Sequence, residues 1–322
     1  MASIAKLVLA ALALVMMPAG VVADEYPSRT IRIIAPFAVG GPTDTSARLI
    51  AEALGRQLGQ PVIVENRSGA GGVLGTEAAA RAQPDGYTLL VSAASTFTVI
   101  PAVKKASYDI KEDFVPLGQI WYAPQALVVN SKSNIKTVAE LVAYAKANPG
   151  KLTFGSAGNG TTTHLSIGLL SREAGIKVNH IPYKSSGQSV VDVLGGQIDA
   201  IFGDISTLAP HAQSGALTAL AVTAPHRSPL LPNTPTMAEA GLPEVRTVNW
   251  FGLHALARTP PAVLERLKTA VRAAQLDPAY QASLAKLSNT TGTVGAERFA
   301  EMIQEEAQRL APIVRSLGIS FN

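Results

Sequence analysis

The sequence predicts an α/β protein made of two lobes. Short runs rich in β-branched residues alternate with amphipathic helical patterns along most of the 322 residues, which is typical of α/β layers. A chain of this length exceeds what one hydrophobic core usually fills. Two long strand-like runs also enter the middle of the chain near residue 120 and leave it near residue 248. We therefore expect one domain inserted into another, joined by two crossing strands.

The first lobe should begin with strands and helices in alternation. Gly59 ends the first helical pattern, and Pro84-Asp85-Gly86 forms a turn before the third strand. The predicted elements in chain order are the strand Thr30–Ala35, the helix Asp44–Leu58, the strand Pro61–Glu65, the helix Val73–Ala82 and the strand Tyr87–Ser92. The chain then runs from Phe114 to Asn130 as a long strand, which we expect to be interrupted at Ala123-Pro124.

The middle region repeats the alternation and predicts the second lobe. Its elements are the helix Val138–Ala147, the strand Leu152–Phe154, the helix Thr163–Glu173, the strand Val178–Tyr183, the helix Ser189–Leu194 and the strands Ile198–Phe202 and Leu217–Thr223. Val248–Leu256 returns to the first lobe, and three helical segments, broken near Pro278 and Thr290–Thr293, run on to Leu317. The predicted boundaries are residues 24–123 plus 249–322 for lobe 1 and 124–248 for lobe 2.

Residues 1–23 have the three regions of a cleavable signal peptide. Lys6 supplies the positive charge, Leu7–Met17 is apolar, and small residues precede a cut before Asp24. The apolar run is too short to be a membrane anchor. The chain has no cysteine, which excludes disulfides, a cysteine nucleophile and a lipid anchor on cysteine. We therefore expect a soluble, non-lipidated protein of the periplasm.

Composition argues against several classes of function. The net charge is only +4 although the pI is near 9.3, and the Lys and Arg residues form no dense cluster. Nucleic-acid binding is therefore not expected. The five histidines lack metal-site spacing, and the glycines of Gly69–Gly75 are wrongly spaced for a dinucleotide loop. No metal or cofactor is predicted, and we expect a monomer.

Two glycine-rich loops carry most of the functional signal. Pro36–Asp44 and Phe154–His164 each follow an apolar run and open a helical pattern. Such a turn places free backbone N–H groups at the positive end of a helix, which suits an anion. Two of these loops, one in each half, predict a cleft that holds a small carboxylate from both sides.

The candidate ligand-binding residues come from these loops and from polar residues after neighbouring strands. They are Phe37, Ala38, Gly40, Gly41, Thr43, Ser92, Ser95, Ser156, Gly158, Asn159, Gly160, Thr161, Thr162, Ser186 and Asp204. Asp44 or Thr43 is expected to cap the first helix rather than touch an anion. His164 is favoured as a structural residue, and Asp204 as either a helix cap or a partner for an ammonium group.

Several motifs then identify a family. In lobe 1 they are Pro36-Phe37-x-x-Gly40-Gly41-x-x-Asp44, Glu65-Asn66-Arg67-x-Gly69-Ala70-Gly71-Gly72, Pro84-Asp85-Gly86-Tyr87-Thr88 and Tyr108-Asp109-x-x-x-Asp113-Phe114. From lobe 2 onward they are Ser156-Ala157-Gly158-x-Gly160-x-x-x-His164-Leu165, Pro182-Tyr183-Lys184, Gly195-Gly196-Gln197-x-Asp199, Leu220-Ala221-Val222-Thr223, Pro232-x-x-Pro235-Thr236-x-x-Glu239-x-Gly241 and Trp250-x-Gly252.

In this order and spacing, from about residue 27 to the C-terminus, the chain resembles the receptors of tripartite tricarboxylate transporters, the Bug family of periplasmic binding proteins. The resemblance implies a type II periplasmic-binding-protein fold. It also implies a carboxylate held between the two loops, often through ordered water. Val39 departs from the proline that is common in the family, which leaves the first loop less restricted.

The expected function is capture of a small carboxylate between two lobes and its delivery to the membrane permease of such a transporter. No catalysis is expected. Two alternatives remain open at this point: a receptor that presents its ligand to a sensor kinase, and an exported serine hydrolase using Ser156 with His164 or His180. The glycine two residues before the serine, which a nucleophile elbow needs, is absent at Ser156. Mono-, di- and tricarboxylates, amino acids and aromatic acids all remain candidate ligands.

Overall fold

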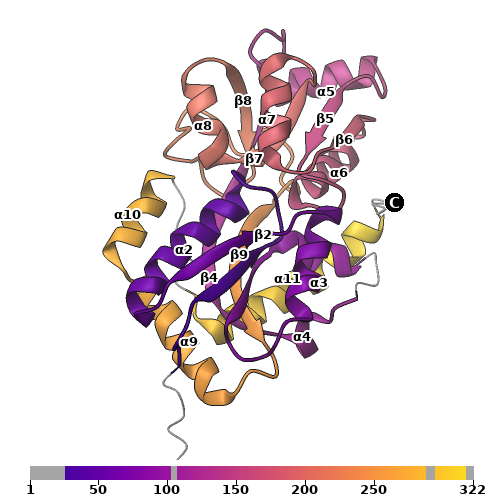
Figure 1. Ribbon diagram of the computed structural model, residues 1–322. Coiled ribbons are helices and arrows are strands. Elements are labelled where there is room, and N and C mark those ends of the chain that lie inside the picture. Colours follow the sequence, from indigo (N-terminus) through magenta and orange to yellow (C-terminus); the bar gives the residue numbers. More distant parts are fainter. Residues whose placement is uncertain (1–25, 103–106, 288–293, 317–322) are drawn as a thin grey trace, which may run out of the picture.

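The computed structural model describes residues 26–102, 107–287 and 294–316. The predicted signal peptide and the predicted helix break at residues 290–293 lie outside these ranges. The described strands form a mixed sheet in the order β2-β1-β3-β9-β4-β7-β5-β6, with β8 paired to β4. Helices lie on both faces of its two halves, which separate into an upper and a lower lobe in Figure 1. The predicted α/β architecture of two lobes is therefore confirmed.

The lower lobe holds the first three predicted strands in parallel pairs. β1 (Ile31–Ala35) lies between β2 (Val62–Asn66) and β3 (Thr88–Ala93). The helices α2 (Pro42–Leu58) and α3 (Val73–Ala80) connect these strands. A π-helical turn over Ser95–Val99, a 3-10 turn over Ile100–Ala102 and the short helix α4 (Ile110–Asp113) follow β3.

The strand β4 (Phe114–Asn130) belongs to both lobes. Its first part pairs with β9 (Val248–Leu256), and from Gln125 onward it pairs with strands of the upper lobe. The interruption expected at Ala123-Pro124 is wrong, because the strand is continuous there. Pro124 lies where β4 changes partners, opposite Val248 at the very start of β9, so its missing N–H interrupts neither ladder.

The upper lobe contains the remaining strands. β5 (Thr153–Ser156) lies between β6 (Asn179–Pro182) and β7 (Ala200–Asp204) in parallel pairs, and β8 (Leu217–Val222) pairs with β4. The connecting helices are α5 (Val138–Ala147), α6 (Thr162–Ala174), α7 (Ser186–Gly195) and α8 (Ile205–Gln213). The helix α7 begins at Ser186 rather than at the predicted Ser189, because Ser185 in extended backbone precedes it.

Three helices complete the chain: α9 (Pro261–Gln275), α10 (Pro278–Lys286) and α11 (Ala296–Ser316). The predicted break near Pro278 is confirmed. The indole N–H of Trp250 on β9 donates to the Glu306 carboxylate on α11 at 2.5 Å. The far end of α11 places Leu310 and Val314 in a hydrophobic cluster formed mainly by upper-lobe residues. The predicted lobe boundaries stay a prediction.

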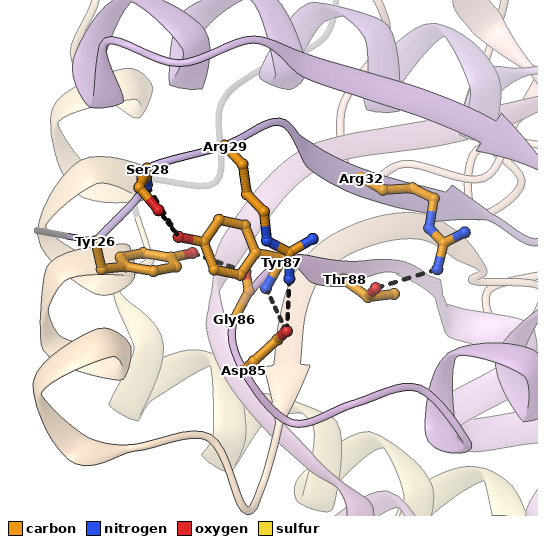
Figure 2. Close-up of polar contacts among 8 residues, drawn as sticks. All are labelled: Tyr26, Ser28, Arg29, Arg32, Asp85, Gly86, Tyr87 and Thr88. Atoms are coloured by element: carbon orange, nitrogen blue, oxygen red, sulfur yellow. Dashed lines mark hydrogen bonds and ion pairs between the residues drawn. The ribbon is translucent and has the colours of Figure 1, made fainter. Parts of the chain in front are cut away.

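The chain enters the fold through a segment held against the turn before β3 (Figure 2). The Tyr26 hydroxyl donates to the Gly86 carbonyl at 2.7 Å, and the Arg29 guanidinium pairs with Asp85 at 2.8 Å. The same guanidinium stacks over the Tyr87 ring, 3.9 Å from its centroid. These contacts fix the chain just ahead of β1, so the first glycine loop leaves the sheet from an anchored strand.

We expect Gly75→Ala to destabilise the protein although alanine is the better helix former. A β-carbon on Gly75 in α3 would come within 2.5 Å of the Arg67 carbonyl oxygen and 2.6 Å of the Pro36 α-carbon. Both are backbone atoms that cannot move aside singly, so the expected loss in urea unfolding is about 1–3 kcal/mol.

Gly55→Ala in α2 is the matched control, because its β-carbon would meet nothing closer than 3.5 Å. There the gain in helix propensity should leave stability unchanged or raise it by up to about 1 kcal/mol. Equal effects of the two substitutions would contradict the close packing of α3 against the first loop.

Candidate functional site

Three helices begin at one small cavity between the lobes. Gly41, Thr161 and Ser185 are the N-cap residues of α2, α6 and α7, and all three line a cavity of about 40 Å³. The full lining is Phe37, Gly41, Pro42, Thr43, Ala93, Ser95, Ala157, Thr161, Thr162, Thr163, Ser185, Ser186, Asn249 and Phe251. The volume is that of one or two water molecules and suits one carboxylate group.

The topology brings these helix ends together. Each of the helices α2, α6 and α7 follows a strand of a parallel pair, β1, β5 and β6 respectively. Within each lobe, parallel strands present their carboxyl ends at one edge, and the helices that follow them start there. Because β1 runs antiparallel to β5 and β6 along the sheet, these two edges face each other across the gap between the lobes. Asn249 and Phe251 reach the same cavity from β9, since alternate residues of a strand share a face.

The cavity is suited to an anion although none of the described residues that line it has a charged side chain. The first turns of the three helices leave backbone N–H groups without intrahelical partners, and each helix end carries a partial positive charge. Eight Ser, Thr and Asn side chains among the lining residues add neutral donors. The hydroxyl of Thr162 is buried and without a hydrogen-bond partner in the described structure, which marks an unfilled donor position in the lining.

The first loop is held by Asp44 rather than capped by it. Gly41 is the N-cap and receives no side-chain bond, so the predicted capping by Asp44 or Thr43 is wrong. The Asp44 carboxylate instead accepts from the Gly40 amide at 3.0 Å and from the Asn66 amide at 3.0 Å. Burial alone would raise the pKa of Asp44, but these bonds and the ion pair with Arg48 hold it below its usual range.

The second loop satisfies its own glycine amides. The Gly158 N–H donates to the Ser156 hydroxyl at 3.1 Å, and the Gly160 N–H donates to His164 Nδ1 at 3.1 Å. His164 therefore has the structural role expected of it. Its ring stacks on His180 with centroids 3.8 Å apart. Burial lowers the pKa of His164 to about 3 and that of His180 to about 4, so both rings are neutral at pH 7.

A larger cavity of about 490 Å³ adjoins the small one and shares Phe37 and Ala157 with it. Its walls are the glycine loop of residues 68–72 from the lower lobe, and Gly158, Asn159 and residues 182–184 from the upper lobe. Lys184 contributes a positive charge to this outer cavity. The two walls touch, because a β-carbon on Gly71 would lie 2.7 Å from the Asn159 carbonyl oxygen. The lobes are therefore closed over the inner cavity.

Asp204 lies behind the inner cavity at the start of α8. It makes no side-chain cap bond, which excludes the predicted capping role. Both carboxylate oxygens instead accept from the Asn249 amide group, at 3.4 and 3.3 Å. Asp204 is only 3 % exposed, and its burial raises the pKa to about 7, with the Asn249 bond opposing that rise.

The structure brings most of the predicted site residues to the two cavities. Those that line the inner cavity are Phe37, Gly41, Thr43, Ser95, Thr161, Thr162 and Ser186, and those that line the outer one also include Gly158 and Asn159. Outside both linings are Ala38, Gly40, Ser92, Ser156, Gly160 and Asp204. The Ser92 hydroxyl donates to the Gly252 carbonyl at 3.2 Å, inside the lower lobe. Direct ligand contact stays a prediction for every member of the set.

Three polar residues of the lining, Asn249, Thr163 and Ser185, are absent from the candidate set. The signal for Asn249 was a polar residue near the start of an otherwise apolar strand, two positions before Phe251 on the same face. Thr163 and Ser185 directly adjoin predicted residues, so extending each loop to its helix N-terminus would have found them.

Comparison with known proteins decides the family. Residues 46–319 match the family described as the tripartite tricarboxylate transporter family receptor. The chain belongs to this receptor family. Protein BugT of Bordetella pertussis is 38% identical over 305 residues, covering 93% of each chain. Solved proteins of the same shape include periplasmic binding proteins, and the family is one of binding proteins rather than enzymes.

Two similar solved structures carry ligands. MatC from Rhodopseudomonas palustris, with bound malate, is 32% identical, has a TM-score of 0.85 and covers 90% of this chain and 100% of its own. A second R. palustris protein, with adipate, is 30% identical, has a TM-score of 0.85 and covers 92% of this chain and 99% of its own. Members of this fold family therefore hold small dicarboxylates.

The serine-hydrolase alternative is not supported. Ser156 Oγ does lie 2.6 Å from His180 Nε2, but Ser156 is fully buried and also bonded to Gly158. A nucleophile must meet its substrate, and the family is not an enzyme family. Within residues 26–102, 107–287 and 294–316, no cluster of His, Asp and Glu could hold a metal. No helix in those ranges is long and apolar enough to cross a membrane.

The neutral histidine pair predicts acid sensitivity. Between pH 6.5 and about 3, His164 is protonated in the unfolded chain but stays neutral in the folded chain. His164 thus contributes stability that is present above pH 6.5 and is lost as the pH falls. The His164→Gln variant should therefore lose less stability than the wild type between pH 7 and 4.5, by about 1–3 kcal/mol in urea unfolding.

The exposed His226 provides the control, and the His226→Gln variant should follow the wild-type curve. The quantity to compare between the variants is the slope of the unfolding free energy against pH. Its absolute value at pH 7 is not used, because His164→Gln also loses the hydrogen bond from the Gly160 N–H. Parallel curves for the wild type and His164→Gln would contradict the neutral, buried assignment.

Proposed function

We propose that this protein captures a small carboxylate between its two lobes and delivers it to the permease of a tripartite tricarboxylate transporter. One observation carries the proposal: three helix N-termini and several neutral hydroxyl donors converge on a cavity of about 40 Å³, and none of its described lining residues is charged. Oriented N–H groups in a dry site bind an anion well, because they need no reorganisation when it arrives.

The inner and outer cavities hold different parts of the ligand. The inner cavity accommodates one carboxylate group, held by the helix ends at Thr43, Thr162 and Ser186. The rest of the ligand extends past Phe37 and Ala157 into the outer cavity. A second carboxylate there would meet Lys184. The malate and adipate held by the two similar structures fit this division.

Ligand capture follows from lobe closure, and no bond is made or broken. The predicted hinge is formed by residues 120–124 and 246–250, where the chain passes between the lobes. Contact of the Gly71 loop with Asn159 encloses the inner cavity. A carboxylate that touches both lobes stabilises this closed form only through its higher affinity for it.

The first test is a carboxylate panel on the mature chain, residues 24–322, refolded to remove any carried ligand. A ligand at 100 times its dissociation constant should stabilise the fold by about 2.7 kcal/mol, which raises the melting temperature by a few degrees. Titration calorimetry then gives the affinity. Absence of binding across mono-, di- and tricarboxylates would refute the proposal.

The second test uses the unpartnered hydroxyl of Thr162. Thr162→Val removes a donor that has no protein partner, so the unliganded protein should keep its stability in urea unfolding. Carboxylate affinity should fall by about 2- to 10-fold, the value of one hydrogen bond.

Thr163→Val is the matched control on the next residue. The Thr163 hydroxyl accepts from the Ala157 N–H at 3.0 Å and lies 2.9 Å from the Thr161 hydroxyl. Its loss should therefore lower the stability of the unliganded protein as well. If Thr162→Val reduces stability without changing affinity, its hydroxyl is not a ligand donor.

A further inference from the structure

Asn249, which lines the inner cavity, has a side-chain amide whose orientation is set by the buried carboxyl group of Asp204. Both carboxylate oxygens of Asp204 lie within 3.4 Å of Asn249 Nδ2. An amide has its NH₂ group on one side and its carbonyl oxygen on the other. Because Nδ2 points toward Asp204, Oδ1 of Asn249 points away from it. Above the pKa of Asp204, where its carboxyl is ionised, reversing the amide would place its oxygen against two carboxylate oxygens, which is repulsive.

The position of Asn249 between Asp204 and the cavity argues that the oxygen turned away from Asp204 faces the cavity. Asn249 lines the cavity beside Phe251, whereas Asp204 is buried and outside the lining. The Thr and Ser hydroxyls around it can rotate to donate or accept, but an amide oxygen can only accept. It therefore disfavours a carboxylate oxygen and favours a hydrogen-bond donor on the ligand.

The small volume of the cavity limits where the hydrogen-bond donor can lie on the ligand. In about 40 Å³, a group that reaches Asn249 must lie within one or two bonds of the carboxylate held by the helix ends. The substituent on the carbon next to the carboxylate meets this condition. The described residues that line the cavity include no charged side chain. A neutral hydroxyl therefore suits the position better than an ammonium group, which would need a facing charge.

We propose that Asn249, oriented by Asp204, makes this receptor selective for 2-hydroxycarboxylates. The inference rests on the proposed function and adds the substrate class to it. Asp204 acts as a positioning residue, because its carboxylate holds the amide and does not line the cavity. Thr162 and the helix ends hold the carboxylate, and the amide oxygen of Asn249 accepts a hydrogen bond from the hydroxyl on the neighbouring carbon.

The experiment compares ligands that differ only at this carbon: malate with succinate, and lactate with propionate. By titration calorimetry on ligand-free protein, the wild type should bind the hydroxy member of at least one pair about 5- to 10-fold more tightly, the value of one good hydrogen bond. Asn249→Leu, close in size but without an acceptor, should weaken the hydroxy member and leave the deoxy member within about 2-fold.

Thr162→Val is the matched control within the same cavity. It should weaken both members of a pair by the same factor, because its hydroxyl faces the carboxylate that they share. Asp204→Ala releases the amide of Asn249, so it should reduce the hydroxy preference without abolishing carboxylate binding. Thermal unfolding confirms that each variant folds, and Asn249→Val, whose branched side chain suits a strand, replaces Asn249→Leu if that variant does not fold.

Each outcome is decisive. Equal affinities for hydroxy and deoxy acids in the wild type would overturn this inference while leaving the carboxylate receptor intact. A preference that survives in the folded Asn249 variant would overturn the role of Asn249. Tighter binding of aspartate than malate would overturn the choice of a neutral hydroxyl. Failure of every carboxylate to bind would overturn the proposed function and this inference together.

Discussion

The backbone ladder of β4 is the constraint on which the rest of the structure depends. One strand pairs with β9 in the lower lobe and, from Gln125 onward, with β7 and β8 in the upper lobe. Its continuity sets one sheet half against the other, so strand ends of both lobes meet at a single gap. Helices that follow those strands must begin there. The proposed anion site is thus a consequence of strand order, and its residues occupy positions that the topology creates.

A buried polar network secures the point where β4 changes partners. The carbonyl oxygen of the Gln125 side chain accepts from Ser166 on α6 at 2.5 Å and from Thr247 at 3.3 Å, and the Thr223 hydroxyl donates to the Thr247 carbonyl at 2.6 Å. Buried hydroxyls with partners specify one arrangement, because any slip leaves them unpaired. Since Ser166 lies one turn into α6, the network also positions the N-terminus of that helix. The same hydrogen bonds therefore stabilise both the point where β4 passes between the lobes and the start of α6 at the inner cavity.

Sequence reasoning predicted the fold and many of the residues that line the two cavities for the same physical reason. Glycine-rich turns such as Gly40-Gly41, placed between an apolar run and a helical pattern, report local backbone chemistry, which a sequence shows directly. It could not show which N–H groups are already used: Asp44 occupies the Gly40 amide and His164 the Gly160 amide. Nor could it pair Asp204 with Asn249, which are distant in sequence and meet only through the β4 ladder. Tertiary pairing, rather than propensity, decides such contacts.

In the proposed binding mode, the groups that hold the carboxylate differ from the groups that select the ligand. Helix ends bind through backbone N–H groups, so the grip survives side-chain changes that preserve the helices. A lysine or arginine in its place would add affinity but would need its own desolvation and positioning. Side chains at the edge of the inner cavity, such as Asn249, and in the outer cavity, such as Lys184, are then free to vary with the ligand. In the proposed function, the fold holds the carboxylate and a few replaceable side chains recognise the remainder of the acid, a division that suits a family in which similar structures contain malate and adipate.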